Sequence, residues 1–270
     1  MRPHEPTPPP PSFEAVLLHR SMTQRAVEDR FWSFDRALPP ATTALILLCL
    51  APMALLYAVE RPWESGGLGG VLGYSPSAQA LRGMGGRVTA LVAQGQTWRL
   101  VSGIFLHGGL LHLLLNVLGI FGLGRLAEAI WGPGRTILLF TLGGLGGAIA
   151  SQLAGVPRSV GASGAIFGLM GALWAFGLLQ RASLPHTLGV ILRRGVGGAI
   201  LLNFALGISL WIIVDNFAHL GGLIVGIVIA PFLQSRTLPW ERPNPTLGLL
   251  AGLTGGLIIA WGLIGALSRW

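Results

Sequence analysis

The amino-acid sequence contains seven apolar runs, each close to the length of helix that crosses a lipid bilayer. The hydrocarbon core of a bilayer is about 30 Å thick, so a helix needs roughly 20 apolar residues to span it. The runs end at charged residues or prolines, and charges are costly inside hydrocarbon. The runs cover residues 42–59, 103–124, 136–156, 162–180, 195–214, 216–233 and 247–267. The pattern predicts an all-α, polytopic membrane protein.

The composition excludes most other classes of protein. Apolar residues make up 52% of the 270 residues and charged residues 10%, whereas a soluble domain carries nearer a quarter of charged residues. All eighteen basic residues are Arg, against ten acidic residues, and the net charge is +8. The arginines form no stripe of the kind that binds nucleic acid, so we expect no nucleic-acid partner.

The arginines predict the orientation in the membrane. With a cytoplasmic N-terminus, twelve of the eighteen fall on the inside, as the positive-inside rule requires. We therefore expect the N-terminus inside and the C-terminus outside, in a cell membrane and most simply a bacterial inner membrane. Residues 1–41 would be a cytoplasmic tail with a short amphipathic helix over 13–34. The long connection 60–102 suits a segment in the membrane interface or an ordered spacer equally well.

Ser163 opens the fourth run between two glycines, Gly161 and Gly164. A serine at a helix start is commonly an N-cap, and that role is one alternative. The other is a nucleophile, because a hydroxyl without bulky neighbours is accessible and lies near free backbone N–H groups that can stabilise an oxyanion.

His219 is the candidate base for such a nucleophile, since the ordinary pKa of histidine suits proton transfer near neutral pH. The fourth and sixth runs cross the membrane in the same direction, so Ser163 and His219 start at similar depth. Gly222 and Gly226 share the helix face of His219, and small residues at this spacing allow close helix packing. The sequence predicts a Ser-His dyad, because no acidic residue lies inside the runs.

The second run carries His112 and Asn116, four residues apart and therefore on one helix face. They could donate hydrogen bonds to an oxyanion or simply join helices. A zinc site formed with His107 and His219 is a third alternative. It is disfavoured because His107 and His112 would lie about 140° apart around a helix, and no carboxylate is near.

Together these residues resemble the rhomboid family of intramembrane serine proteases, over roughly residues 98–233. Each motif alone is weak, but their order in a multipass chain is specific. The four motifs are Trp98-Arg99; His112 and Asn116 with His107 upstream; Gly161-Ala162-Ser163-Gly164; and Ala218-His219 with Gly222 and Gly226.

The resemblance implies an endopeptidase that cleaves transmembrane segments of other proteins within the bilayer, without metal or cofactor. By it, Ser163 would be the nucleophile and His219 the general base. His112 and Asn116, with the backbone N–H of Ser163, would stabilise the oxyanion.

The resemblance also predicts the architecture. Residues 42–235 would form a six-helix catalytic core, and residues 236–270 a linker and an extra seventh helix outside it. Trp98 and Arg99 would be structural. Phe167 replaces the tyrosine that often packs on the catalytic histidine, and we expect the ring stacking to survive this change.

Two other functions compete with this prediction. An inactive relative that binds membrane clients would typically have lost the serine or the histidine, and this chain retains both Ser163 and His219. A transporter or channel would be expected to show an inverted repeat or charged midplane residues, and the sequence has neither.

Overall fold

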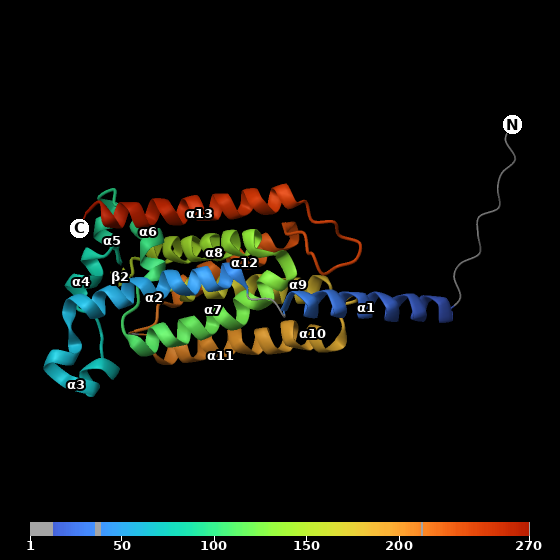
Figure 1. The fold of residues 1–270 in the computed structure, drawn as a ribbon, viewed down its shortest axis with the longest axis horizontal. Coiled ribbons are helices and arrows are strands. Elements are labelled where there is room, and N and C mark those ends of the chain that lie inside the picture. Colours follow the sequence, from blue (N-terminus) through green and yellow to red (C-terminus); the bar gives the residue numbers. More distant parts are fainter. Residues whose placement is uncertain (1–12, 36–38, 212, 270) are drawn as a thin grey trace, which may run out of the picture.

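The computed structural model describes residues 13–35, 39–211 and 213–269. Apolar helices dominate it (Figure 1). The long elements are α1 (Phe13–Asp35), α2 (Pro40–Glu60), α7 (Leu110–Trp131), α8 (Pro133–Leu153), α9 (Ser163–Leu179), α12 (Asn216–Ile229) and α13 (Pro245–Leu267). α10 (His186–Val190), the π-helical turn η2 (Ile191–Gly195) and α11 (Val196–Ser209) form one continuous helix, and α12 ends in the 3-10 turn η3 (Ala230–Phe232).

Each predicted apolar run overlaps a helix, and the prediction of an all-α polytopic protein is confirmed. Among the described residues, five helices are long and apolar enough to cross a membrane; α9 and the helix Asn216–Phe232 are shorter. The count of seven crossings stays a prediction. The fifth run was placed too late, because its helix covers His186–Ser209 and tolerates Arg193 and Arg194 in its first half. Long Arg side chains can reach the interface from such positions.

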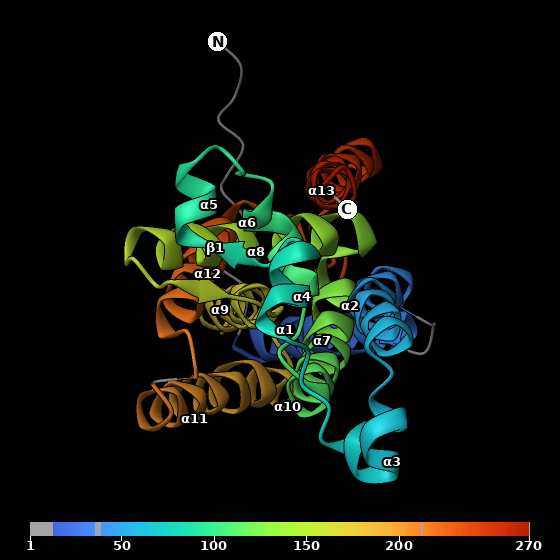
Figure 2. The same ribbon diagram turned by 90° about the vertical axis from the view of Figure 1, so that its left-hand side faces the viewer.

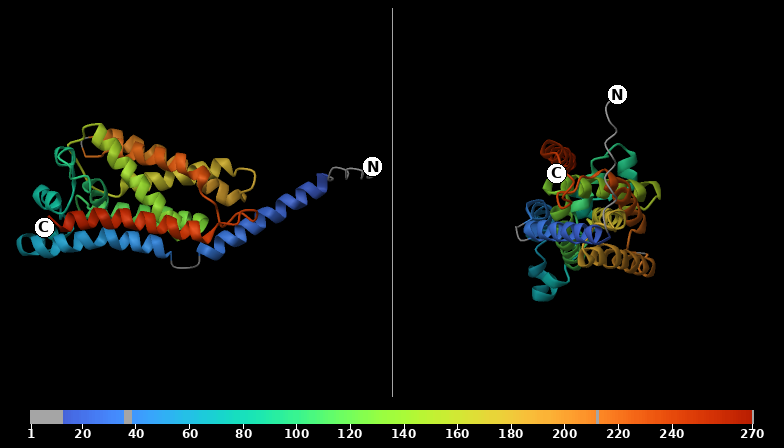
Figure 3. Two further views of the ribbon diagram at one scale, coloured as in Figure 1. Left: turned by 90° about the horizontal axis from the view of Figure 1, so that it is seen from above. Right: turned by 90° about the vertical axis from the view of Figure 1, so that its right-hand side faces the viewer.

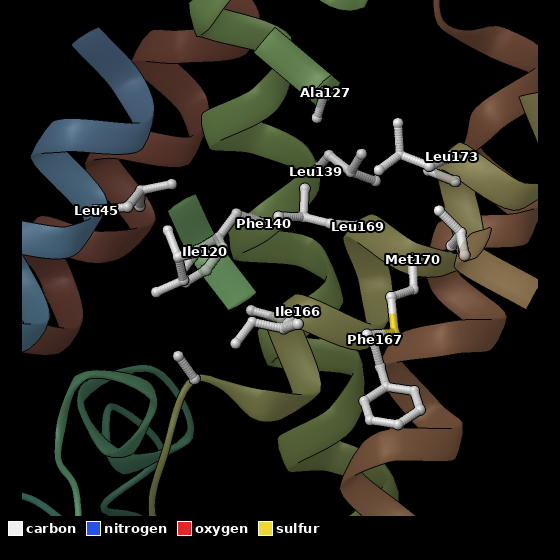
Figure 4. Packing of buried hydrophobic residues seen from close by; sticks show 14 of the residues in the cluster. Leu45, Ile120, Ala127, Leu139, Phe140, Ile166, Phe167, Leu169, Met170 and Leu173 are labelled. Atoms are coloured by element: carbon white, nitrogen blue, oxygen red, sulfur yellow. The ribbon is translucent and has the colours of Figure 1, made fainter. Parts of the chain in front are cut away.

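α9 forms the centre of the bundle, with α7, α8 and α12 around it (Figure 2). All but one of residues 164–177 are buried, because this helix has no charged side chain and is apolar on every face. Figure 4 shows how Ile166 and Leu169 of α9 lie close to Phe140 of α8 and Ile120 of α7. A helix buried on all sides gives Ser163, at its start, a rigid support.

Glycines bring the backbones of α12 and α9 into direct contact. A Cβ atom on Gly222 would lie 1.9 Å from the carbonyl oxygen of Gly164, and one on Gly226 would lie 2.0 Å from that of Gly168. The close approach predicted from the spacing of these glycines is therefore present, and only glycine fits at either position.

The long connection between α2 and α7 is ordered and gathers at one end of the bundle (Figure 1). It contains α3 (Pro62–Leu72), α4 (Ala78–Gly83), β1 (Arg87–Val88), α5 (Thr89–Ala93), α6 (Arg99–Ser102) and the 3-10 turn η1 (Gly103–Phe105). β1 pairs antiparallel with β2 (Arg158–Ser159), with Arg87 opposite Ser159. This small sheet joins the connection to the segment that leads into Ser163.

α13 packs against α8 and α6, and its assignment as an extra helix outside a six-helix core stays a prediction. A Cβ on Gly252 would lie 3.0 Å from Gly134 of α8, and one on Gly265 would lie 2.5 Å from the Trp98 ring. Gly256 meets no atom within 4 Å, so not all of the glycines of this helix pack. The last helix therefore supports the connection that contains Trp98.

α1 extends from the opposite end of the bundle (Figures 1 and 3). Its Val27 and Phe31 are buried in the core, which fixes its C-terminal half. The predicted helix over 13–34 is therefore present, while the proline run of residues 8–11 lies outside the described residues.

Candidate active site

Ser163 is the first residue of α9 and is partly exposed. The residue before it, Ala162, occupies the N-cap position, so the hydroxyl does not cap its own helix. Gly161 has a φ of +122°, a backbone conformation that other residues adopt only with strain. The glycine thus turns the chain so that the Ser163 side chain is available at the helix start.

His219 lies in the first turn of α12, and its Nε2 is 2.9 Å from the Oγ of Ser163. The imidazole is 7% exposed, so this hydrogen bond is largely shielded from solvent. The proximity predicted from two parallel, glycine-faced helices is present. In a serine hydrolase, such a pair lets the imidazole accept the hydroxyl proton as the oxygen attacks.

The imidazole is held by aromatic rings. Phe167 stacks on it with ring centroids 4.2 Å apart and planes 12° from parallel, and Phe204 approaches edge-on at 6.4 Å. The Nδ1 of His219 is buried and has no hydrogen-bond partner within the described part of the chain. Asp215 stands one turn before His219, but its carboxylate accepts bonds from Ala218 N–H and Ser151 instead. Ser163 and His219 thus form a hydrogen-bonded pair, and Phe167 rather than a carboxylate packs on the imidazole.

Replacing Phe167 with leucine should lower kcat/KM about 2- to 10-fold if this pair is catalytic. An aromatic pair contributes roughly 0.5–1.5 kcal/mol beyond its buried area, and leucine removes that term while it retains apolar bulk. Phe167→Tyr keeps the ring and should remain within about twofold of the wild type. Cleavage rates per folded molecule check both variants; equal rates for Phe167→Leu and the wild type would show that stacking does not position the imidazole.

His112 lies on α7 against the loop that precedes Ser163. Its Nδ1 accepts a hydrogen bond of 3.3 Å from the Gly108 backbone N–H, which leaves the ring proton on Nε2. A Cβ on Gly161 would lie 2.8 Å from that Nε2. His112 therefore presents an N–H donor beside the Ser163 loop, and Gly161 is also the residue that makes room for the ring.

Asn116 lies one turn further along α7 and is buried. Its Nδ2 donates to the His112 carbonyl at 2.8 Å, and its Oδ1 has no partner among the described residues. The structure thus places Asn116 on the same helix face as His112, as predicted, but forms no hydrogen bond between it and Ser163.

The predicted position of His107 on the same helix as His112 is wrong. The second run was taken as helical from residue 103, whereas α7 begins at Leu110, after Gly108 and Gly109. His107 lies in the turn before the helix, and its ring contacts that of His112 edge-on at 5.2 Å. No group of three or more His, Cys, Asp or Glu suited to a metal ion occurs in the ranges that the structure describes.

Trp98 and Arg99 are buried in the connection before α7. The Arg99 guanidinium donates to the carbonyl oxygens of Arg82 at 2.7 Å and Gly86 at 3.0 Å, and lies 4.5 Å from the centre of the Trp98 ring. These contacts fold the connection upon itself, and the structural role of Trp98 and Arg99 stays a prediction.

Three residues that sequence reasoning missed meet beside the site: Arg87, Ser151 and Asp215. The Arg87 guanidinium donates to the Ser151 hydroxyl at 2.8 Å and lies 4.0 Å from the Asp215 carboxylate. They come from three elements 64 residues apart in sequence, so no local motif connects them. The sequence shows Arg87 only as one arginine of the long connection. Its burial, which would have singled it out, is visible only in the fold.

Comparison with known proteins identifies the family. A sequence model of the rhomboid domain matches residues 94–236, more than half of the chain. Rhomboid protease GluP of Bacillus subtilis is 37% identical over 161 residues, which cover 60% of this chain and 31% of that protein. RHOMBOID-like protein 5 of Arabidopsis thaliana is 36% identical over 164 residues, which cover 60% of this chain and 52% of that protein. RHOMBOID-like protein 6, mitochondrial, of the same plant is 34% identical over 207 residues, which cover 76% of this chain and 64% of that protein.

The chain thus spans between about a third and two thirds of the lengths of these relatives. The family match includes the Ser163 loop, His112, Asn116 and the His219 helix. It also covers α6 to α12 and leaves α13 outside. This chain belongs to the rhomboid family.

Proposed function

We propose that this chain is an intramembrane serine endopeptidase that cleaves transmembrane segments of other membrane proteins. The observation that carries the proposal is the 2.9 Å contact between Ser163 Oγ and His219 Nε2. It joins a hydroxyl at a helix start to an imidazole that packs against the Phe167 and Phe204 rings. A purely structural serine would bond to its own helix or cap it, and Ser163 does neither.

In the proposed reaction, Ser163 Oγ attacks the scissile carbonyl carbon while His219 Nε2 accepts its proton. The protonated imidazole then gives this proton to the nitrogen of the leaving peptide, and an acyl-enzyme remains on Ser163. A water molecule attacks the acyl carbon while His219 accepts its proton. The imidazole then returns this proton to Ser163 Oγ, which restores the hydroxyl as the carboxyl product leaves.

Two kinds of N–H donor stand where the oxyanion would form. Ser163, as the first residue of α9, has a backbone N–H without a partner inside its helix. His112 offers its Nε2 proton beside Gly161. Asn116 would join them by turning its amide away from the His112 carbonyl when substrate binds, since catalytic hydrogen bonds often tighten only in the complex.

The location of the dyad matches the chemistry of the proposed substrate. Ser163 and His219 both lie in the first turn of their helices, at the end of the bundle that holds the ordered connection. With the N-terminus cytoplasmic, this end is the outer one, where water can reach the site. Peptide bonds inside a helix are shielded by backbone hydrogen bonds, so a transmembrane substrate must unwind locally before it is cut.

The same proposal assigns a role to each part of the chain. Residues 42–235 form the catalytic membrane core, residues 1–41 a cytoplasmic tail, and residues 236–270 a linker and the seventh helix. Catalysis by the dyad uses no metal or cofactor, and the partners are the lipid bilayer and membrane-embedded substrates.

The experiment is cleavage of a panel of model transmembrane substrates by the purified protein in liposomes. In parallel, a fluorophosphonate probe tests for covalent labelling of the active serine. Cleavage together with labelling at Ser163 is the expected result, with no change when a chelator is added. A folded protein that binds these segments but neither cleaves nor labels would instead be a client-binding relative.

A further inference from the structure

We propose that three residues, Arg87, Ser151 and Asp215, here called the Arg87 cluster, fix two segments relative to each other. These are the segment from β2 to Ser163, here called the Ser163 loop, and α12, the helix that carries His219. This inference rests on the proposed function and assigns positioning residues for it. Within the described part of the chain, no hydrogen bond joins the cluster to the Ser163 hydroxyl or the His219 ring, and we infer its effect from the backbone segments that carry these two groups.

Arg87 is the centre of the cluster and is 2% exposed. Its guanidinium donates to Ser151 Oγ at 2.8 Å, the Val156 carbonyl at 2.9 Å and Thr89 Oγ1 at 2.9 Å. Burial lowers the pKa of the Arg87 guanidinium, and the negative charge of Asp215 opposes that change. A buried cation with one nearby carboxylate makes that carboxylate hard to replace.

Asp215 connects this cation to the helix of the base. One carboxylate oxygen accepts the Ala218 N–H at 3.0 Å, which makes Asp215 the N-cap of α12. The other accepts the hydroxyl of Ser151, near the end of α8. His219 directly follows Ala218, so the position of the imidazole depends on a cap whose carboxylate is fixed from outside the helix.

The backbone of Arg87 connects the same cluster to the nucleophile. Arg87 pairs with Ser159 in the two-stranded sheet, four residues before Ser163. Gly161 N–H then donates to the Gly103 carbonyl at 3.0 Å, just ahead of the serine. One residue thus fixes the Ser163 loop through its main chain and the His219 helix through its side chain.

The test uses Asp215→Asn, which keeps a cap acceptor and removes the charge, Arg87→Gln, and the double variant. For each, kcat and KM are measured in liposomes, and the fluorophosphonate labelling rate is measured without substrate. We expect each single variant to lose about tenfold in kcat and in labelling, with KM within twofold. The double variant should lose no more than the worse single variant, because both break one unit. Arg158→Gln, an exposed neighbour on β2, is the matched control.

Hydrogen exchange gives a second readout that needs no activity. Both single variants should raise exchange together in peptides covering 157–165 and 214–222, and Arg158→Gln should not. The coupling between the Ser163 loop and the His219 helix would be overturned by additive losses of kcat in the double variant. Faster exchange in only one of the two segments would overturn it as well. A different result would separate the two proposals. If the wild type neither cleaves nor is labelled, but both single variants still raise exchange in both segments, the proposed function is refuted and the structural role of the Arg87 cluster is retained.

A second inference concerns the opposite end of the bundle, where we propose a site for the headgroup of a phospholipid with net negative charge. A cavity of about 420 Å³ opens there between α1 and the segment that joins α9 to α10. Its lining residues are Gln24, Arg181, Ala182, Leu184, His186 and Arg193. Two guanidinium groups and no acidic side chain among these residues favour an anion.

The cavity is formed where membrane helices end. Arg193 donates to the carbonyl of Gly177, near the C-terminal end of α9, at 3.3 Å, and its guanidinium lies against Gly189. Gln24 of α1 closes the other side through a 3.4 Å hydrogen bond to the Leu184 carbonyl. Basic cavities between helices at the cytoplasmic surface are suited to lipid phosphates, since the acyl chains can remain in the adjoining bilayer.

Thermal unfolding in detergent tests this site. Phosphatidylglycerol should raise the Tm of the wild type by several degrees, while phosphatidylcholine and inorganic phosphate at the same concentration should not. The double variant Arg181→Gln/Arg193→Gln should lose most of this shift, and Arg158→Gln at the other end should keep it. An equal shift with inorganic phosphate would overturn the assignment to a lipid, and a full shift in the double variant would overturn the site.

Discussion

Replacing Ser163 with alanine is expected to lower the cleavage of a transmembrane substrate by a factor on the order of 10⁴ or more. Removal of the attacking oxygen leaves only binding and oxyanion stabilisation, which account for a small part of the rate in serine hydrolases. The Ser163 hydroxyl also supplies the 2.9 Å contact to His219, so the variant loses both the nucleophile and the hydrogen bond that joins it to the imidazole.

His219→Ala should fall by a similar factor, and the double variant should fall no further, because a nucleophile and its base act as one unit. Ser209→Ala is the matched control, since among the described residues this exposed hydroxyl bonds only to the Ala205 carbonyl of its own helix. Rates should be compared at equal folded fraction, with and without chelator. Cleavage that survives Ser163→Ala would refute the serine mechanism, and loss with chelator alone would indicate a metal.

The second large effect is expected from Gly222→Ala in α12. The added Cβ would lie 1.9 Å from the Gly164 carbonyl oxygen and 2.8 Å from its carbon, so two backbones must separate. Overpacking typically costs about 1–3 kcal/mol, and we expect the upper end or more because a backbone cannot rotate away as a side chain can. A shift of about 1 Å between α12 and α9 would also lower the cleavage rate roughly 100-fold.

Gly256→Ala in α13 is the matched control, because no atom lies within 4 Å of its Cβ position. Thermal unfolding in detergent and cleavage in liposomes should both change for Gly222→Ala and remain near wild type for Gly256→Ala. Wild-type stability for Gly222→Ala would mean that the two helices are not in close contact. Lost stability with an unchanged rate would mean that their separation does not set the dyad distance.

The glycine spacing that makes Gly222 sensitive was readable in the sequence, as were Ser163, His219 and Phe167. The stacking of Phe167 on His219 was expected only from the resemblance to the rhomboid family, whereas the glycine spacing and the placing of Ser163 and His219 at helix starts follow from helix geometry. The fold class followed in the same way, because long apolar runs have few stable alternatives in a bilayer.

The errors and omissions arose where geometry depends on distant contacts. His107 was assigned to a helix because its run is uniformly apolar, and apolarity does not reveal that Gly108 and Gly109 end the turn before α7. Arg87 looked like one more loop arginine, since its partners Ser151 and Asp215 are set beside it by the packing of α8 and α12. Hydrophobic periodicity locates helices but does not show which loop side chains their ends will enclose.

The contact between Trp98 and Gly265 has a consequence for how the protein is made. The connection that contains Trp98 is synthesised early, whereas Gly265 lies at the end of α13, about 170 residues later in the chain. Ala266 is also set against Gly85, so the connection has two partners in the last helix. Until the ribosome has released this helix into the bilayer, the indole lacks one wall of its pocket. Biosynthesis therefore completes the packing of the connection last, after the helices that carry Ser163 and His219 have entered the membrane.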